Sequence, residues 1–236
     1  MHVLAIDTST DTGSAALWVD GAVRLSRTWQ VASRHAEHLL GEVGTLLTEA
    51  GVTPAGLDLI AVSIGPGSFT GVRIGLATVK GLALAQGTKI VGVASTEALA
   101  FAAARSQTGP KVTVVTLLDA YKSEVFGAVY EVAGMDVLTK VEPFNGSPGD
   151  AARVVGAALS GGQYVVCGTG LRKYPEAFAA LSTSADTRFD IPAAASWVDL
   201  AVARFEVRGP SDLVALEPLY IRGADAALPA TPLRTA

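Results

Sequence analysis

The same plan of three strands, a helix, a fourth strand and a second helix occurs twice along the 236 residues of this chain. In each copy the first strand is apolar and ends at an aspartate, Asp7 in one and Asp119 in the other. Strands Val3–Asp7, Ser14–Val19, Ala22–Trp29 and Leu59–Ile64 and helices Ala36–Ala50 and Phe69–Gln86 are predicted for the first copy. The second copy is predicted to contain a strand ending at Asp119, strands Val125–Glu131 and Asp136–Val141, a strand in "QYVVCGTG", and helical segments Asp150–Leu159 and Tyr174–Leu181. A duplicated unit constrains the fold more than any single motif does.

Two such units predict an α/β protein with the duplicated actin-like fold, which acetate and sugar kinases, heat-shock chaperones and actin share. In that fold two mixed-sheet domains face each other across a cleft. The segment "STEALAFAAARSQTGP" predicts a helix followed by a Gly-Pro break, so we expect a domain boundary there. The N-terminal domain then covers residues 1–107. A smaller C-terminal domain covers residues 108–236 and includes helix Ala193–Val207 and the tail.

The composition limits what the chain can bind. Half of the residues are hydrophobic and 17% are charged, so we expect a folded core and a surface partly covered by a partner. With 22 acidic and 18 basic residues, strong tRNA or DNA binding by this chain alone is not expected. Cys167 is the only cysteine, which excludes an internal disulfide. No apolar stretch approaches the roughly 20 residues that span a membrane, and the apolar run at the N-terminus is too short to predict a signal peptide, so a cytoplasmic protein is expected.

The stretch "SIGPGSFTGVRIGLATVKGLALAQG", residues 63–87, joins a strand to a helix through a glycine-rich turn. Its spacing fits neither the P-loop nor the dinucleotide-binding pattern. Ser68 is a suitable N-cap for a helix that begins at Phe69. Three interpretations stay open: a tight turn with a capped helix, an anion contact at the helix N-terminus, and a place in a partner surface.

The helix Phe69–Gln86 has few polar side chains on any side. One stripe suits a core face and comprises Phe69, Val72, Leu76, Val79 and Ala83. The opposite side of the helix carries two cations together with small and apolar residues: Arg73, Ala77, Lys80 and Leu84. A helix that is apolar all round is buried on both sides. This helix therefore either lies deep in the protein or is covered by a helix of a partner.

The loop after the first strand is the place where an actin-like ATPase organises magnesium and phosphate. Such an ATPase has a glycine where this chain has Ser9. The groups that would contact a phosphate or nucleotide are Asp7, Thr8, Ser9 and Ser68. The simpler interpretation is that Asp7 caps the turn through the backbone.

Other candidate catalytic or metal-binding groups are few. His35 and His38 lie one turn apart, but a metal site needs a third ligand and no metal is expected. Asp119, Lys122 and Glu124 surround the first turn of the second copy. They either form a catalytic acid–base pair or belong to a hairpin with local charge pairing.

Five segments together resemble the TsaB (YeaZ) family of threonylcarbamoyladenosine biosynthesis proteins: "AIDTST", "RHAEHLL", "GPGSFTGVRIGLATVKGLA", "DAYKSEVFGAVYE" and "EPLYIR". The resemblance covers nearly the whole chain. It implies an actin-like, cytoplasmic, non-catalytic subunit without a cofactor. It also implies pairing with the larger paralogue TsaD, the threonylcarbamoyl transferase, and action with the ATPase TsaE in tRNA modification. The chain would then reach tRNA only through the complex.

The resemblance implies docking through helices of the N-terminal domain. The expected docking residues are Phe69, Thr70, Arg73, Ala77, Lys80 and Leu84 on one helix and His35 and Leu39 on another. An exposed docking face would also allow a homodimer when the partner is absent. A nucleotide is expected only weakly or at the joint surface with the partners.

Two residues depart from the family pattern in the second domain. Tyr121 replaces the arginine of Asp-Ala-Arg, and Phe126 replaces the tyrosine of Glu-Val-Tyr. A ligand role tied to that arginine therefore does not carry over.

The alternative function is an actin-like ATP-dependent kinase or ATPase acting on a small molecule. Ser9 and the missing phosphate loops count against it.

Overall fold

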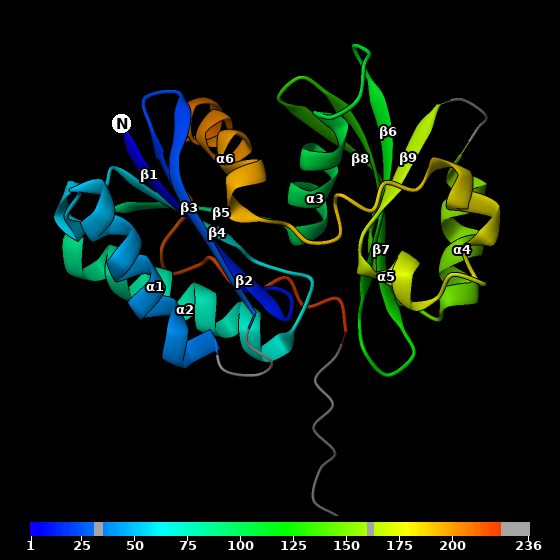
Figure 1. Cartoon of the computed structure of the whole chain (residues 1–236), viewed down its shortest axis with the longest axis horizontal. Helices are drawn as coiled ribbons and strands as arrows, with labels where there is room; N and C mark the ends of the chain where they lie inside the picture. Colours follow the sequence, from blue (N-terminus) through cyan, green and yellow to red (C-terminus); the bar gives the residue numbers. More distant parts are fainter. Residues whose placement is uncertain (31–34, 160–162, 223–236) are drawn as a thin grey trace, which may run out of the picture.

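The computed structural model describes residues 1–30, 35–159 and 163–222. These residues form two sheets with helices between them and on their outer sides (Figure 1). The first copy of the unit comprises β1 His2–Asp7, β2 Thr12–Val19, β3 Ala22–Gln30, α1 His35–Ala50, a 3₁₀ turn Pro54–Gly56, β4 Leu59–Ser63, α2 Phe69–Gln86, β5 Lys89–Val93 and α3 Ser95–Ala104. The second copy comprises β6 Val112–Asp119, β7 Val125–Ala133, β8 Asp136–Gly146, α4 Pro148–Ala158, β9 Tyr164–Cys167, α5 Thr169–Lys173 and a 3₁₀ segment Ala179–Ser184, and α6 Ala194–Arg208 follows. The duplicated actin-like α/β fold is confirmed.

The first sheet has the strand order β3-β2-β1-β4-β5. β1 is antiparallel to β2 and parallel to β4, so Leu4 has Leu17 as its neighbour on one side and Ile60 on the other. Asp20 and Gly21 close the β2–β3 hairpin with φ angles of 45° and 103°. β5 is absent from the predicted strands. Its short run "KIVGV" lies between two apolar helices and carries no periodicity of its own.

The second sheet has the order β8-β7-β6-β9, with β6 antiparallel to β7 and parallel to β9. The predicted helical segment Tyr174–Leu181 is wrong, because α5 already ends at Lys173 and the 3₁₀ segment begins only at Ala179. Pro175 explains the break. A proline disfavours helical backbone at the residue before it, and Tyr174 has φ −129° and ψ 56°.

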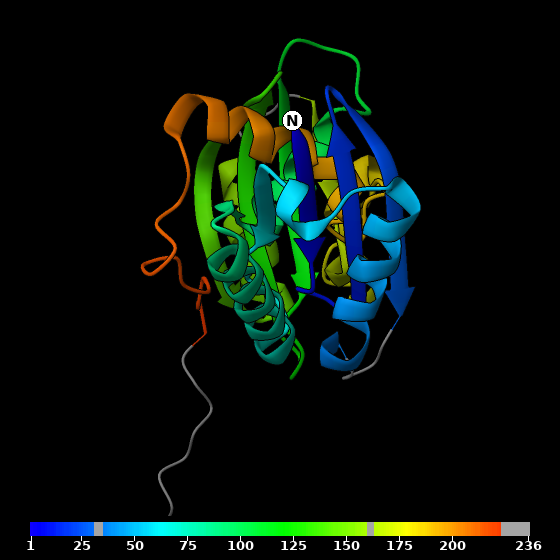
Figure 2. The same cartoon turned by 90° about the vertical axis from the view of Figure 1, so that its left-hand side faces the viewer.

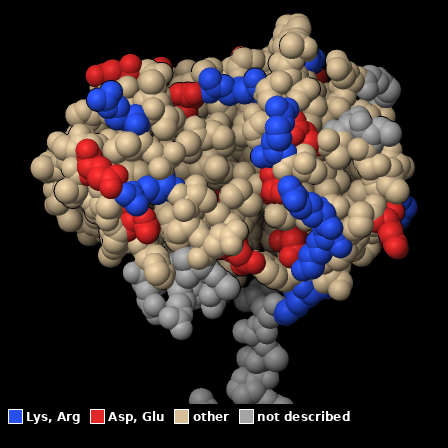
Figure 3. All heavy atoms as spheres, viewed as in Figure 1, with Lys and Arg blue, Asp and Glu red and all other residues tan. Residues whose placement is uncertain are grey.

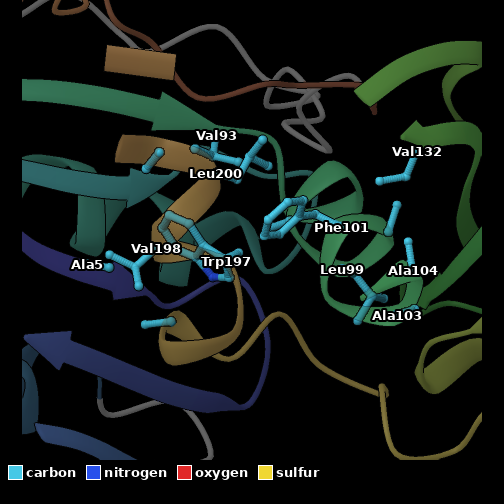
Figure 4. Packing of buried hydrophobic residues seen from close by; sticks show 14 of the residues in the cluster. Ala5, Val93, Leu99, Phe101, Ala103, Ala104, Val132, Trp197, Val198 and Leu200 are labelled. Carbon is cyan, nitrogen blue, oxygen red and sulfur yellow. The ribbon is translucent and has the colours of Figure 1, made fainter. Parts of the chain in front are cut away.

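The helices and sheets alternate as layers (Figure 1). α1 and α2 cover one face of the first sheet, where they bury Leu4 and Ile6. The other face carries Val3 and Ala5, and it shares one core with α3, α6 and the inner face of the second sheet. Figure 4 shows Phe101 of α3 and Trp197 of α6 in the space between the sheets, and both are fully buried. α4 and α5 lie on the outer side of the second sheet.

The C-terminal part of the chain returns to the first domain. The boundary expected near residue 107 lies between α3 and β6, whereas α6 and the tail, which we expected to close the second domain, contact the first sheet. α6 packs against β1, β2 and β5. Its apolar side covers the face of the first sheet opposite α1 and α2, while α3 packs between α6 and the inner face of the second sheet. Among residues 1–30, 35–159 and 163–222 no helix combines the length and apolar character needed to cross a membrane.

Candidate functional site

The loop after β1 is closed directly onto the N-terminus of α2. Thr8 donates its hydroxyl hydrogen to the Gly71 carbonyl at 2.7 Å, and the Ser68 amide donates to the Ser9 carbonyl at 2.7 Å. Glycine is required at two of the contact points, because a Cβ on Gly67 or Gly71 would clash with the backbone oxygens of Ser9 and Thr8. The glycine-rich turn therefore serves close packing between loop and helix. Ser68 is the N-cap, as predicted, and its hydroxyl accepts from the Gly71 amide at 3.2 Å.

Asp7 is buried at the base of this loop, with 1% of its surface exposed. Its carboxylate accepts from the Ser9 amide at 2.9 Å and from the Ser9 hydroxyl at 3.0 Å. Burial raises the pKa of the Asp7 carboxyl to about 6, while the bonds from Ser9 oppose the shift. Asp7, Thr8 and Ser9 thus already have partners within the protein. Contact of these groups and Ser68 with a phosphate stays a prediction, which this closed geometry does not favour.

α2 has one buried and one exposed side. Val72, Leu76, Val79 and Ala83 are buried, so the helix does not lie deep in the protein on all sides. Phe69 was placed on the core stripe, and this is wrong: 45% of its surface is exposed, because the first helical turn extends past the core. The residues exposed on the outer side are Thr70, Arg73, Ala77, Gly81 and Leu84, with Lys80 half-buried.

α1 extends this outer side. Leu39, which we expected among the docking residues, is fully buried in the core, whereas its neighbour Leu40 is 57% exposed. Leu39 therefore has to be replaced by Leu40, one helical position further on. His38 is exposed, and the side chain of His35 lies outside the described residues. We use the name α1–α2 face for the exposed small and apolar residues of both helices: Leu40, Gly41, Gly44, Thr45, Thr48, Thr70, Ala77, Gly81 and Leu84.

The segment after α6 runs along α2 as a strap, residues 209–222 (Figure 2). The Arg73 guanidinium lies 3.7 Å from the centre of the Phe69 ring, and its Nε donates to the Tyr220 hydroxyl at 2.5 Å. Lys80 donates to the Val214 carbonyl at 3.0 Å. Both cations expected for docking thus contact their own chain. The sequence pattern does not reveal these contacts, because the partners are 147 and 134 residues apart.

The turn that begins the second domain closes onto the loop after β1. The Tyr121 hydroxyl donates to Asp11 at 2.6 Å, across the two domains. Burial, together with this bond, raises the pKa of the Tyr121 hydroxyl. Asp119 pairs with Lys173 at 2.7 Å, and Glu124 pairs with Arg222 at 3.4 Å. The hairpin with charge pairing is therefore favoured over the acid–base pair.

A cavity of about 620 Å³ lies between the N-terminus of α2, this turn and the strap. Its lining is largely apolar and includes Phe69, Phe126 and Tyr220, with Arg73 at one side. This volume is in the range of small-molecule sites.

The described residues contain no group of three or more His, Cys, Asp or Glu side chains placed to hold a metal ion. Figure 3 shows Lys and Arg atoms over the second domain with Asp and Glu atoms beside them. Ion pairs of this domain include Arg188–Asp186 at 2.6 Å and Lys173–Asp119 at 2.7 Å. Cations that are already paired with carboxylates attract the phosphates of a nucleic acid backbone less strongly.

The duplicated mixed sheets, with the cleft loops bonded to each other and one helix face open, define an α/β protein of the actin-like class. The family model for the tRNA N6-adenosine threonylcarbamoyltransferase TsaD matches residues 29–190. The tRNA threonylcarbamoyladenosine biosynthesis protein TsaB of Escherichia coli is 30% identical over 94% of this chain and 95% of its own length. The chain belongs to the TsaB (YeaZ) family.

Further comparisons agree with this assignment. A solved Pseudomonas aeruginosa structure, described as an uncharacterized protein with similarity to peptidase YeaZ, superposes with a TM-score of 0.81 at 30% identity. It covers 94% of this chain and 99% of the other. The tRNA N6-adenosine threonylcarbamoyltransferase of Anaeromyxobacter dehalogenans is 40% identical over 108 residues, which are 39% of this chain and 32% of the transferase.

Proposed function

We propose that this chain is a non-catalytic scaffold and activator in the biosynthesis of threonylcarbamoyladenosine in tRNA. It pairs with the transferase TsaD, acts with the ATPase TsaE, and reaches tRNA only through their complex. The observation that carries the proposal is the α1–α2 face: two long helices of the chain expose mainly small and apolar side chains there, with Arg73 as the exposed charge on α2. The E. coli relative supports the pathway by its name.

The cleft supports a role without chemistry of its own. An actin-like ATPase needs a carboxylate and backbone amides that are open to magnesium and phosphate. Here Asp7 is buried against Ser9, and the loop that would hold a phosphate is filled by the N-terminus of α2. Tyr121 bonds to Asp11 across the cleft mouth. No cofactor is proposed for the chain alone. A nucleotide at the joint surface with the partners remains a prediction.

The likeness to the transferase supports the choice of partner. Two chains of one fold can pair through equivalent helices in a nearly symmetric way, as identical subunits do around a two-fold axis. The match to the transferase family model includes α1 and α2, the two helices of the open face. The small residues Ala77, Gly81 and Gly44 allow a partner helix to approach closely. Two copies of this chain would compete for the same face when the transferase is absent.

The test is co-purification with the paralogous transferase and a tRNA modification assay with and without this chain. Ala77→Arg places a long cation where the helices approach and should weaken pairing about 30-fold or more, with a matching loss of modification. The control is Ala157→Arg, at an exposed position of α4 in the second domain. Both variants should melt like the parent. Leu84→Asp serves in place of Ala77→Arg if that variant does not fold.

Two results would overturn the proposal. One is unchanged affinity and modification in a folded Ala77→Arg or Leu84→Asp variant, which would place docking elsewhere. The other is robust ATP turnover by the chain alone that disappears in Asp7→Ala, which would make the chain an ATPase.

A further inference from the structure

An apolar ridge runs along the line where α2 meets the strap. It consists of Phe69 and Tyr220 at one end of the helix and Leu84 and Val214 toward the other. The exposed fractions of these side chains are 45%, 47%, 76% and 86%, respectively. The Phe69 and Tyr220 rings lie 5.4 Å apart. Large apolar side chains gathered along one line are unusual for a solvated surface and mark an interaction site.

The strap is held firmly to the first domain. The Ser211 amide donates to the Ile90 carbonyl at 2.8 Å, and the Leu219 amide donates to the Ile64 carbonyl at 2.7 Å. Asp212 caps the turn between these anchors by accepting from the Val214 and Ala215 amides. Val214 therefore projects from a segment fixed on both sides. A fixed backbone presents a side chain to a partner at a low entropy cost.

Contacts within the ridge hold the two cations of α2 in place. Arg73 lies against both rings, at 3.7 Å from the Phe69 centroid and 5.3 Å from the Tyr220 centroid. Lys80 is bonded to the backbone of the strap at Val214. The strap thus draws both charged groups to the side of α2. Beside these held cations, α2 exposes Ala77 between them and Leu84 one turn beyond Lys80.

The α1–α2 face alone is too small for a stable complex. The helices have 16 and 18 residues, so at 1.5 Å per residue a strip about 10 Å wide along both covers about 500 Å². A specific interface buries roughly 800 Å² on each partner. The ridge borders this face without a gap, because Leu84 belongs to both and Val214 is bonded to Lys80 one turn away.

We propose that the ridge is the second half of the docking surface, occupied by the same protein chain that docks on the α1–α2 face. That partner meets the ridge with apolar side chains. The inference rests on the proposed function and adds the strap, Tyr220 and Val214, to it. The ridge is continuous with the α1–α2 face, and that face alone offers less area than a specific interface needs. Both observations favour a single partner that covers the two surfaces over a separate ligand on the ridge.

The test compares two exposed valines. Val214→Asp places a carboxylate on the ridge, whereas Val207→Asp places one on α6, where the side chain is 84% exposed. Because each valine is almost fully exposed, both variants should melt like the parent. Val214→Asp should weaken binding to the paralogous transferase about tenfold or more, and Val207→Asp should leave it unchanged. Tyr220→Ser should also weaken it.

The outcomes separate the inference from the proposed function. If Ala77→Arg abolishes pairing while Val214→Asp and Tyr220→Ser bind like the parent, the docking surface ends at α2 and the inference is wrong. If Ala77→Arg also binds like the parent, the proposed function fails as well. Equal weakening by Val207→Asp and Val214→Asp would point to a general charge effect and would also overturn the inference.

Discussion

At the scale of single residues, Asp7 shows why an acidic group can be kept inside this protein. Its carboxylate accepts hydrogen bonds from the amide and hydroxyl of Ser9, and these bonds, together with one from the Ser63 side chain, lower its pKa by less than burial raises it. Removal from water therefore dominates and raises its pKa from 3.8 to about 6. The folded state retains the proton over a pH range in which the unfolded chain has already lost it. Stability consequently falls as the pH rises from about 4 to about 6, and the full loss is present above that range.

We predict that Asp7→Asn makes the protein more stable near neutral pH. The amide keeps the acceptor for the Ser9 backbone and can donate to the Ser9 hydroxyl, but it carries no charge. A pKa raised by about two units corresponds to up to about 3 kcal/mol at pH ~7.5, and to almost no difference at pH ~4. Urea unfolding at both pH values measures this, with Asp136→Asn at the exposed β7–β8 hairpin as control. A variant that is less stable than the parent at both pH values would contradict the account.

At the scale of elements, α2 combines three functions in one helix. Its first turns pack against the loop after β1, its inner side builds the core, and its outer side is exposed and belongs to the proposed docking surface. The surroundings of the glycines in α2 differ between its packed side and its exposed side. A Cβ on Gly71 would clash with the Thr8 backbone oxygen, whereas a Cβ on Gly81 would meet nothing within 4 Å.

We predict opposite effects from the same substitution at these two positions. Gly71→Ala should destabilise the chain by about 1–3 kcal/mol, because backbone has to move to admit the methyl group. Gly81→Ala should stabilise it by about 0.5–1 kcal/mol, because alanine loses less entropy in a helix. Thermal and urea unfolding of the two variants measure this directly. Equal destabilisation by both would mean that the loop does not press on the helix as described.

The same helix shows how far sequence reasoning reaches. Its bounds, Phe69–Gln86, were predicted correctly because Ser68 and Gly87 provide cap signals at both ends. Phe69 and Leu39 were misplaced because a periodic pattern cannot tell where the neighbouring sheet ends, nor which of two adjacent leucines faces it. The bond from Tyr121 to Asp11 and the strap contacts of Arg73 lie beyond local patterns. Their partners are more than 100 residues apart, and only the folded chain brings them together.

At the scale of the whole molecule, the two domains share one core. α3 and α6 lie between the sheets, and the buried cluster around Phe101 and Trp197 includes residues of both sheets. The repeat therefore divides the chain into two topological units, but these units share a core and do not have separate stabilities. An actin-like enzyme that opens and closes needs a cleft that can separate, and here the space between the sheets is filled with apolar side chains.

We predict that both domains unfold in a single transition. Phe178→Ala removes a fully buried ring from the outer core of the second domain and should cost about 3–5 kcal/mol. Native-state hydrogen exchange should report the same loss at Val129 in β7 and at Ile6 in β1 of the other domain. A loss confined to β7 would show that the second domain opens on its own.

The return of α6 to the first sheet bears on how the protein is made on the ribosome. β5 ends at Val93, and the helix that closes the apolar face of its sheet ends at Arg208, 115 residues later. At roughly 5–20 residues per second, translation needs about 6 to 23 s to add these residues, and that face of the sheet stays uncovered during this time. In a nascent chain α1 and α2 therefore lie on a sheet whose other face is still uncovered, so docking of the proposed partner would follow only when synthesis is nearly complete.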